Sequence, residues 1–211
     1  MNRRHFLALT ASLSTALFGL STAHAMPFAF EEGVHYKKLP DTARALVAKG
    51  TVQEFFFYGC SHCMDMEKPL HEWLNSKPKG VTLEQIPAVF QSPAWSMLAR
   101  VHYALKSTNQ LTHAHALAFD VFVKDRAKPK NHQDIADLLV VKHAAFDKEA
   151  FIKAYESEAL NNDVTRAAKL SAQYQLEAVP AFVINGQYVT DLPMAGSHAK
   201  LFTLIEQLAT K

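Results

Sequence analysis

The chain contains two cysteines, Cys60 and Cys63, which are separated by Ser61 and His62. Residues three apart on a helix lie on the same face, so the two sulfurs can come within bonding distance. Two cysteines are too few for a four-cysteine zinc site or for a small scaffold stapled by several disulfides. The chemistry open to them is that of a single dithiol: reversible disulfide exchange, one permanent disulfide, or part of a metal site.

The position of the pair favours exchange. An apolar run, residues 51–58, ends just before Cys60, and a helical pattern begins just after it. Cys60 then lies at a helix N-terminus, where unpaired N–H groups and the helix dipole stabilise a thiolate, and His62 adds a donor or a cation. A lowering of the Cys60 pKa by about 3 units favours the reduced thiolate by about 4 kcal/mol. It also makes the disulfide more oxidising by on the order of 90 mV.

Two other interpretations of the pair stay open. A permanent disulfide closing four residues adds only roughly 2 kcal/mol, and a chain with 49% hydrophobic residues has little need of it. A metal site would need further ligands among the 11 histidines. His113 and His115 are two apart and do not share a helix face, which is not the spacing of metal ligands.

The predicted elements follow the order strand, helix, strand, a block of helices, hairpin and helix. The apolar run is typical of a strand buried on both faces, and Asn185-Gly186 of a two-residue hairpin turn. Pro69 predicts a kink or a break in the helix after the cysteines. We expect strands at 51–58, 81–86, 181–184 and 187–190, helices at 61–74 and after Ser197, and a helical block at 92–174 with starts at Ser92, Asn131 and Asp147.

The first segment is typical of an export signal. Arg3 and Arg4 precede an uncharged apolar run, 6–20, and small residues follow up to Ala25. The run is shorter than the about 20 residues that span a membrane, so we favour a cleaved signal peptide, 1–25, over a retained anchor. The general and the twin-arginine export routes both stay open. Removing 25 of the 211 residues leaves 186, in an oxidising compartment outside the cytoplasm.

The composition excludes several classes of protein. The formal net charge of +2 is far too small for a nucleic-acid-binding surface, and Arg3 and Arg4 alone account for it. The low counts of glycine and proline, 7 and 9, exclude a collagen-like fibre. The hydrophobic content of 49% excludes a disordered chain. The mature chain is a formally neutral globular protein: an α/β unit, 26–91 with 175–211, into which the helical block 92–174 is inserted.

Three segments carry a resemblance to a known family. They are EGVHYKKL at 32–39, EFFFYGCSHC at 54–63 and VPAFVINGQY at 179–188. With the helical block between the last two, the chain resembles the DsbA family of periplasmic thiol:disulfide oxidoreductases over nearly its whole mature length. The resemblance implies a thioredoxin fold with a mainly helical domain inserted between its second and third core strands.

The resemblance also implies roles for individual residues. Cys60 is expected to be the exposed nucleophile and Cys63 the buried resolving thiol. Pro180 is expected to be cis and to face the disulfide, so that a polypeptide pairs with the backbone of Val179. The alternative for Val179-Pro180 is an ordinary proline at a strand start.

Glu54 is the one acidic residue of the apolar run, and the family has an acidic residue at this place. Burial would raise its pKa, and it could exchange a proton with Cys63, whereas a Glu at a strand edge would reach solvent. The chain departs from the family at two positions: Ser61 replaces the usual proline, which leaves the redox potential open, and Gln85 stands where a lysine commonly accompanies the buried acid.

The function implied is the transfer of disulfides to reduced, unfolded exported proteins. The family implies re-oxidation by a quinone-coupled membrane protein resembling DsbB, with no bound cofactor and no metal, and a monomer is expected because 186 residues leave no room for an added dimerisation region. A disulfide isomerase and an oxidase dedicated to one client are alternatives of the same fold. A metal-binding or chaperone module without catalysis is the alternative from another class.

Overall fold

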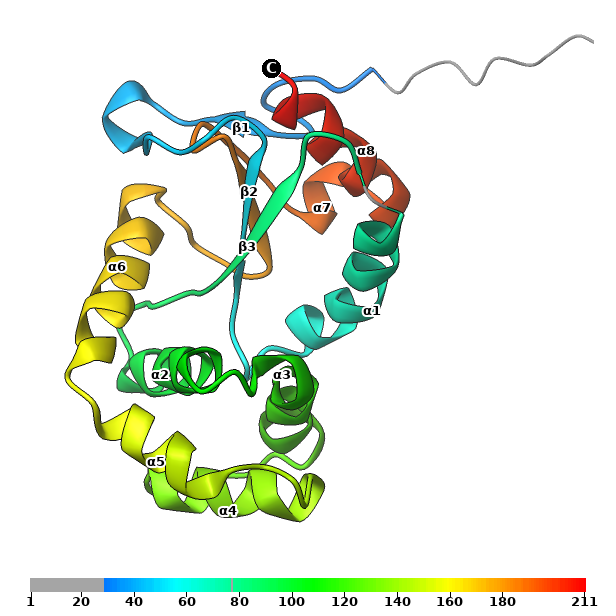
Figure 1. The fold of residues 1–211 in the computed structure, drawn as a ribbon. Coiled ribbons are helices and arrows are strands. Elements are labelled where there is room, and N and C mark those ends of the chain that lie inside the picture. The colour runs from blue at the N-terminus through cyan, green and yellow to red at the C-terminus, as the bar shows by residue number, and fades with distance from the viewer. Residues whose placement is uncertain (1–28, 77) are drawn as a thin grey trace, which may run out of the picture.

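The computed structural model describes residues 29–76 and 78–211, so the predicted signal segment 1–25 lies outside the described residues. A five-stranded sheet with the order β1-β5-β4-β2-β3 forms the centre of the molecule (Figure 1). β2 is parallel to β3 and antiparallel to β4. The strands are β1 Lys37–Lys38, β2 Thr51–Phe56, β3 Thr82–Pro87, β4 Ala181–Ile184 and β5 Tyr188–Thr190.

β2 is buried between two neighbours and between two layers of helices. Its side chains contribute to two cores: Val52 belongs to the same cluster as Met66 of the first helix, and Phe55 and Phe56 belong to the other cluster. The strand ends two residues earlier than the sequence predicts, at Phe56, because the backbone then turns and the Cys60 N–H donates to the Phe57 carbonyl at 2.9 Å. This turn delivers Cys60 to the end of the central strand.

The predicted hairpin is confirmed. Asn185 and Gly186 both have positive φ, 53° and 63°, as a two-residue turn of this kind requires. A Cβ on Gly186 would lie 2.2 Å from the Ala45 carbonyl oxygen, so only glycine fits. The Asn185 side chain accepts from the Gly50 N–H at 2.7 Å and donates to the Leu208 carbonyl at 3.0 Å, which fixes the turn to the rest of the unit.

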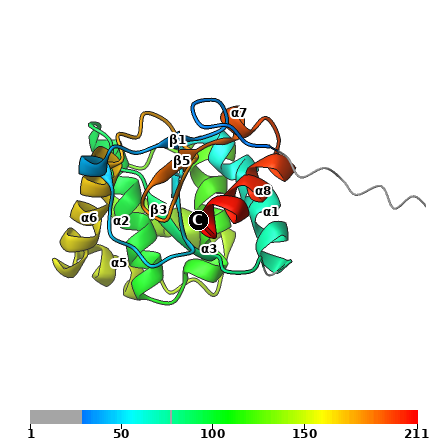
Figure 2. The ribbon, with the colours of Figure 1, turned by 90° about the horizontal axis from the view of Figure 1, so that it is seen from above.

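Helices α1 Ser61–Asn75, α7 Leu192–Ala195 and α8 His198–Ala209 cover one face of the sheet, and α6 Ala159–Gln173 lies on the other (Figures 1 and 2). α1 runs without interruption through Pro69, so a break there is not found. The buried side of α1, which includes Cys63, Met66, Leu70 and Trp73, continues on both sides of the proline, and this packing outweighs the one hydrogen bond that proline removes.

The helical block lies between β3 and β4 in the chain, below the sheet in Figure 1. It contains α2 Pro93–Ser107, α3 Leu111–Phe119, a π-helical turn Asp120–Lys124, α4 His132–Lys142 and α5 Lys148–Glu156, and leads into α6. Asn131 and Asp147 cap α4 and α5 with their side chains, as the sequence predicts, whereas Ser92 occupies the cap position of α2 without a side-chain cap bond. The predicted fold class is confirmed; the domain boundaries at 92 and 174 stay predictions. None of the helices described is both long and apolar enough to cross a membrane.

Candidate active site

The two cysteines lie at the start of α1, and their thiols are free. Cys60 is the N-cap residue, and its Sγ accepts a hydrogen bond from the Cys63 N–H at 3.4 Å. Cys63 is one turn further on and fully buried, whereas Cys60 is partly exposed. One sulfur is therefore open to attack and the other is shielded.

The loop before β4 faces Cys60. The Val179-Pro180 peptide bond is cis, as the family resemblance implies. The Cys60 thiol donates to the Val179 carbonyl at 3.6 Å, although the two residues are 119 positions apart in the chain. Pro180 has no N–H, so the backbone groups available to a ligand here are those of Val179 and its neighbours.

Hydrogen bonds lower the pKa of Cys60 to about 6. The largest contribution is the hydrogen bond from the Cys63 thiol; the backbone N–H groups of Cys63 and His62 and the charge of His62 add to it, and partial burial opposes it. Burial strongly raises the pKa of Cys63, and the neighbouring Cys60 raises it further. At neutral pH the reduced pair is a Cys60 thiolate beside a Cys63 thiol.

Glu54 is completely buried, so the alternative of a carboxylate reaching solvent is excluded. Its Oε2 accepts from the Gln85 side chain at 2.9 Å, and its Oε1 has no hydrogen-bond partner among the described residues. Burial raises the pKa of Glu54 to about 8; the charge of Glu67 contributes, and the bond from Gln85 opposes the rise. Gln85 does face Glu54, at the place where the family resemblance implies a partner for the buried acid, and the carboxyl is protonated at neutral pH.

Replacement of Glu54 by Gln should stabilise the fold above pH 5. The folded pKa of about 8 lies above the reference value of 4.5, because the fold disfavours the charged carboxylate. The free energy of unfolding is therefore highest below pH 4.5 and falls as the pH rises through 8. A neutral amide removes that loss. We expect Glu54→Gln to raise the free energy of unfolding by about 4 kcal/mol at pH 8 and to leave it unchanged near pH 4. Urea unfolding across this range measures it.

The matched control for this substitution is Glu72→Gln, an exposed carboxylate on α1 that pairs with Lys68. It should shift stability by less than about 1 kcal/mol at every pH. A Glu54→Gln protein whose stability follows the same pH dependence as wild type would show that Glu54 is ionised in the fold.

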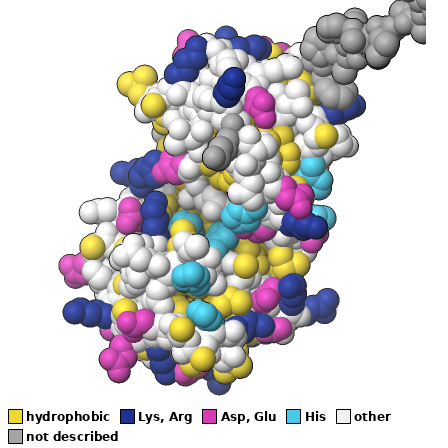
Figure 3. Space-filling view, turned by 45° about the vertical axis from the view of Figure 1, so that its right-hand side comes forward, with side chains coloured by type: hydrophobic (Ala, Val, Ile, Leu, Met, Phe, Trp, Pro, Cys, Tyr) yellow, Lys and Arg dark blue, Asp and Glu magenta, His cyan; other side chains and the backbone are white. Residues whose placement is uncertain are grey.

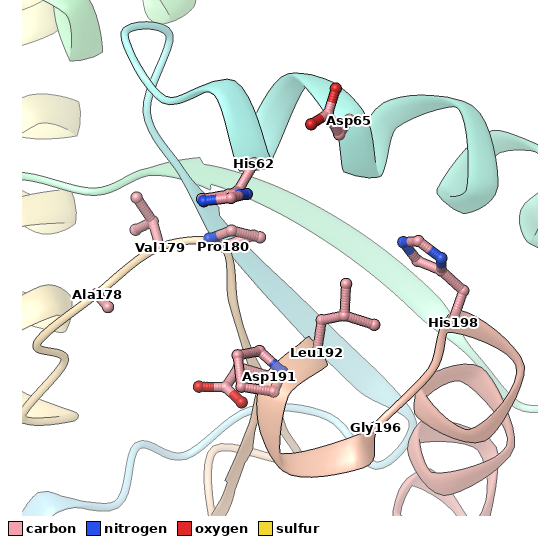
Figure 4. Close-up of a pocket in the computed structure, with 10 residues that line it drawn as sticks. His62, Asp65, Ala178, Val179, Pro180, Asp191, Leu192, Gly196 and His198 are labelled. Carbon is pink, nitrogen blue, oxygen red and sulfur yellow. The ribbon is translucent and has the colours of Figure 1, made fainter.

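A cavity of about 680 Å³ lies beside His62, the residue before Cys63, and the Val179-Pro180 loop (Figure 4). His62 and Asp65 of α1 line one side, Val179 and Pro180 line another, and Leu192 and His198 come from α7 and α8. The wall combines apolar side chains with a few polar groups, an arrangement typical of ligand pockets. The site therefore has room for side chains of a bound molecule next to Cys60.

Sequence reasoning missed a buried polar group behind the cysteines. Tyr58, His102 and His115 are buried there, and Glu67 lies at its edge. The signal in the sequence is the presence of histidines inside two apolar helical segments, VHYAL and LTHAHALAF, where a buried polar contact is an alternative to a metal site. Within 29–76 and 78–211, no three His, Cys, Asp or Glu side chains are grouped so as to hold a metal ion.

Comparison with known proteins places the chain in a family. The model of the DSBA-like thioredoxin domain matches residues 51–202. The chain belongs to this family. The thiol:disulfide interchange protein DsbA of Azotobacter vinelandii is 31% identical over 190 residues, which cover 90% of this chain and 87% of that protein. DsbA of Pseudomonas syringae pv. tomato is 29% identical over 209 residues, 99% of this chain and 95% of the relative.

Solved structures agree with the sequence relatives. The crystal structure of Pseudomonas aeruginosa DsbA superimposes with a TM-score of 0.77 at 29% identity, covering 85% of this chain and 93% of that one. The DSBA-like membership confirms the thioredoxin-like fold and the resemblance seen in the sequence. The family match and these DsbA relatives show that the protein is a disulfide oxidoreductase, and the matched domain includes Cys60 and Cys63.

Proposed function

We propose that the protein introduces disulfide bonds into reduced, unfolded exported polypeptides. The observation that carries this proposal is the asymmetry of the pair: a partly exposed Cys60 with a low pKa next to a buried Cys63 with a high one. A stabilised Cys60 thiolate favours the reduced state of the protein. The Cys60–Cys63 disulfide is then a strong oxidant, which passes its disulfide to the thiols of a client.

The reaction starts from the Cys60–Cys63 disulfide. A client thiolate attacks Cys60 Sγ, a mixed disulfide forms, and the Cys60–Cys63 bond breaks with Cys63 as the leaving group. Cys63 takes up a proton, for which the buried, protonated carboxyl of Glu54 is the proposed donor. The second client thiol then loses its proton and attacks the client sulfur of the mixed disulfide. Cys60 leaves as a thiolate, the client has lost two electrons, and the protein has gained them.

The loop at Val179-Pro180 is the proposed binding edge for the client. An extended polypeptide beside Cys60 would pair with the backbone of Val179, since Pro180 offers no competing N–H. The cavity between α1, this loop and α7 would receive a neighbouring client side chain. His62 lines it and contributes a positive charge toward Cys60, and Ser61 is exposed at the position where the family's usual proline would stand.

The cellular setting is part of the proposal. A signal segment cleaved near Ala25 would place the protein in the periplasm, where the relatives' activity implies a supply of reduced client proteins. A quinone-coupled membrane protein resembling DsbB would then re-oxidise Cys60 and Cys63, without a bound cofactor. The thioredoxin-like part, 26–91 with 175–211, would supply the chemistry, and the insert 92–174 would cover one side of it.

An isomerase or a client-specific oxidase of the same fold would use the same residues. An isomerase needs the reduced form as its working state, and relies on a dimer; the proposed oxidase is a monomer that works from its disulfide. A metal-binding or chaperone module would bind its ligand without exchanging thiols.

The test is stoichiometric oxidation of a reduced, unfolded protein that has two cysteines. Each equivalent of the oxidised protein should remove two client thiols and end with two free thiols of its own, counted by alkylation and mass. A client that keeps its thiols while the protein keeps its disulfide would overturn the proposal. Faster reshuffling of a scrambled client than oxidation of a reduced one would favour the isomerase.

A further inference from the structure

His115 of α3 makes contacts on both sides of the cysteine motif. Its Nδ1 lies 2.8 Å from the Tyr58 hydroxyl, and its Nε2 lies 3.3 Å from Glu67 Oε2. Tyr58 precedes Cys60 by two residues, and Glu67 follows Cys63 by four. One imidazole from the helical block therefore spans the segment that carries both cysteines. In Figure 1, α3 lies beside the start of α1 and the end of β2.

The imidazole is itself held in place. The rings of Phe56 and Phe119 contact it edge-on, with centroids 5.1 and 5.3 Å away, and the residue is only 7% exposed. The nearby His102 ring lies 5.9 Å away, also edge-on. Histidine side chains gather on this side of the molecule between its upper and lower parts, as Figure 3 shows. A side chain so enclosed has one orientation, so it can define the positions of its partners.

The Tyr58 hydroxyl lies close to both buried histidines. Burial holds the pKa of Tyr58 well above its usual range, so its hydroxyl keeps its proton; the oxygen lies 2.8 Å from His115 Nδ1 and 3.5 Å from His102 Nδ1. The other ring nitrogen of His115, Nε2, faces the Glu67 carboxylate. Nε2 has no hydrogen-bond partner among the described residues, so Glu67 Oε2 is a close neighbour at 3.3 Å and not a bonded partner. Tyr58 and Glu67 therefore contact opposite nitrogens of one ring.

We propose that His115 is a positioning residue for the disulfide chemistry: by fixing Tyr58 and Glu67, it holds the β2–α1 loop and the first turns of α1 so that Cys60 stays at the helix N-terminus. This rests on the proposed function and adds to it a role for the helical block. The bonds that stabilise the Cys60 thiolate depend on this geometry, since they come from the Cys63 thiol and from the backbone N–H groups of His62 and Cys63. A loop that can shift would weaken all of them together.

The experiment is a titration of the Cys60 thiolate in the reduced protein, followed by its ultraviolet absorbance. We expect Tyr58→Phe and His115→Leu each to move the midpoint upward by about half to one unit, a three- to ten-fold loss of thiolate at low pH. His115→Gln should restore the wild-type midpoint, because its amide can accept from Tyr58 and donate toward Glu67. The double variant Tyr58→Phe/His115→Leu should shift no further than His115→Leu alone, since His115→Leu already removes the contact with Tyr58.

The matched control is His113→Leu, an exposed position on the same helix, which should titrate like wild type. If His115→Leu does not fold, Tyr58→Phe decides, because it removes only a hydroxyl and keeps the packed ring. A folded Tyr58→Phe protein with an unchanged midpoint would overturn the proposal, even if its thermal stability falls. The titration uses no client, so this failure would leave the proposed oxidation of clients intact.

Discussion

Replacement of Cys60 by Ser should abolish client oxidation. Cys60 is the partly exposed sulfur and carries the low pKa, whereas Cys63 is fully buried and cannot be reached by a client thiolate. Without Cys60 there is no disulfide to donate, and a serine hydroxyl cannot replace it. We expect a rate lower by on the order of 10³-fold or more in the client oxidation assay, with the substitution leaving the fold intact.

A comparison with Cys63→Ser makes this result specific. That variant keeps the reactive Cys60, so it should form a stable mixed disulfide with a client disulfide, which mass spectrometry detects. Cys60→Ser should form none. Oxidation by Cys60→Ser at the wild-type rate would mean that the cysteine pair is structural and that the activity lies elsewhere.

The reduced protein should be more stable than the oxidised protein, by an amount that depends on pH. The pKa of Cys60 is lowered in the folded state from 9.0 to about 6, so the stabilisation is fully present above pH 9 and is lost as the pH falls through 6. A shift of this size corresponds to about 4 kcal/mol for a buried group. Because Cys60 is partly exposed, solvent screening reduces this, and we expect ~2 kcal/mol.

Urea unfolding of both redox forms between pH 4 and 9 measures this difference. Glu54 is present in both forms, so its own pH dependence largely cancels when one curve is subtracted from the other. The expected difference rises through the window from pH 6 to 9 in favour of the reduced form. A more stable oxidised form at every pH is the behaviour of a structural disulfide and would contradict the assignment.

Local signals in the sequence predicted much of the fold. Asn185-Gly186 specified its turn through backbone conformation alone, and Asn131 and Asp147 specified helix starts through bonds to residues three positions away. The cysteine motif was predictable for the same reason: its spacing and its place after an apolar run already fix the helix N-terminus. In each case the groups that determine the structure are close in the chain.

Features set by distant residues were harder to predict. The polar cluster joins Tyr58 with His102 and His115, more than 40 residues away, and no local pattern shows which histidines will meet a tyrosine. The predicted break at Pro69 is not found for a related reason: the packing of α1 against the sheet decides whether the helix continues. Glu54 lay between these cases: the apolar run indicated its burial, but only the structure showed its bond to Gln85.

The most direct test of the proposed function is equilibration of the protein with glutathione buffers, read by alkylation of Cys60 and Cys63. The low pKa of Cys60 favours the dithiol, so the pair should be half reduced at a potential less negative than about −200 mV, and a client disulfide should form at its expense. A pair that stays oxidised until the buffer reaches about −300 mV or below would be a structural bond. That result would contradict a role as a disulfide donor.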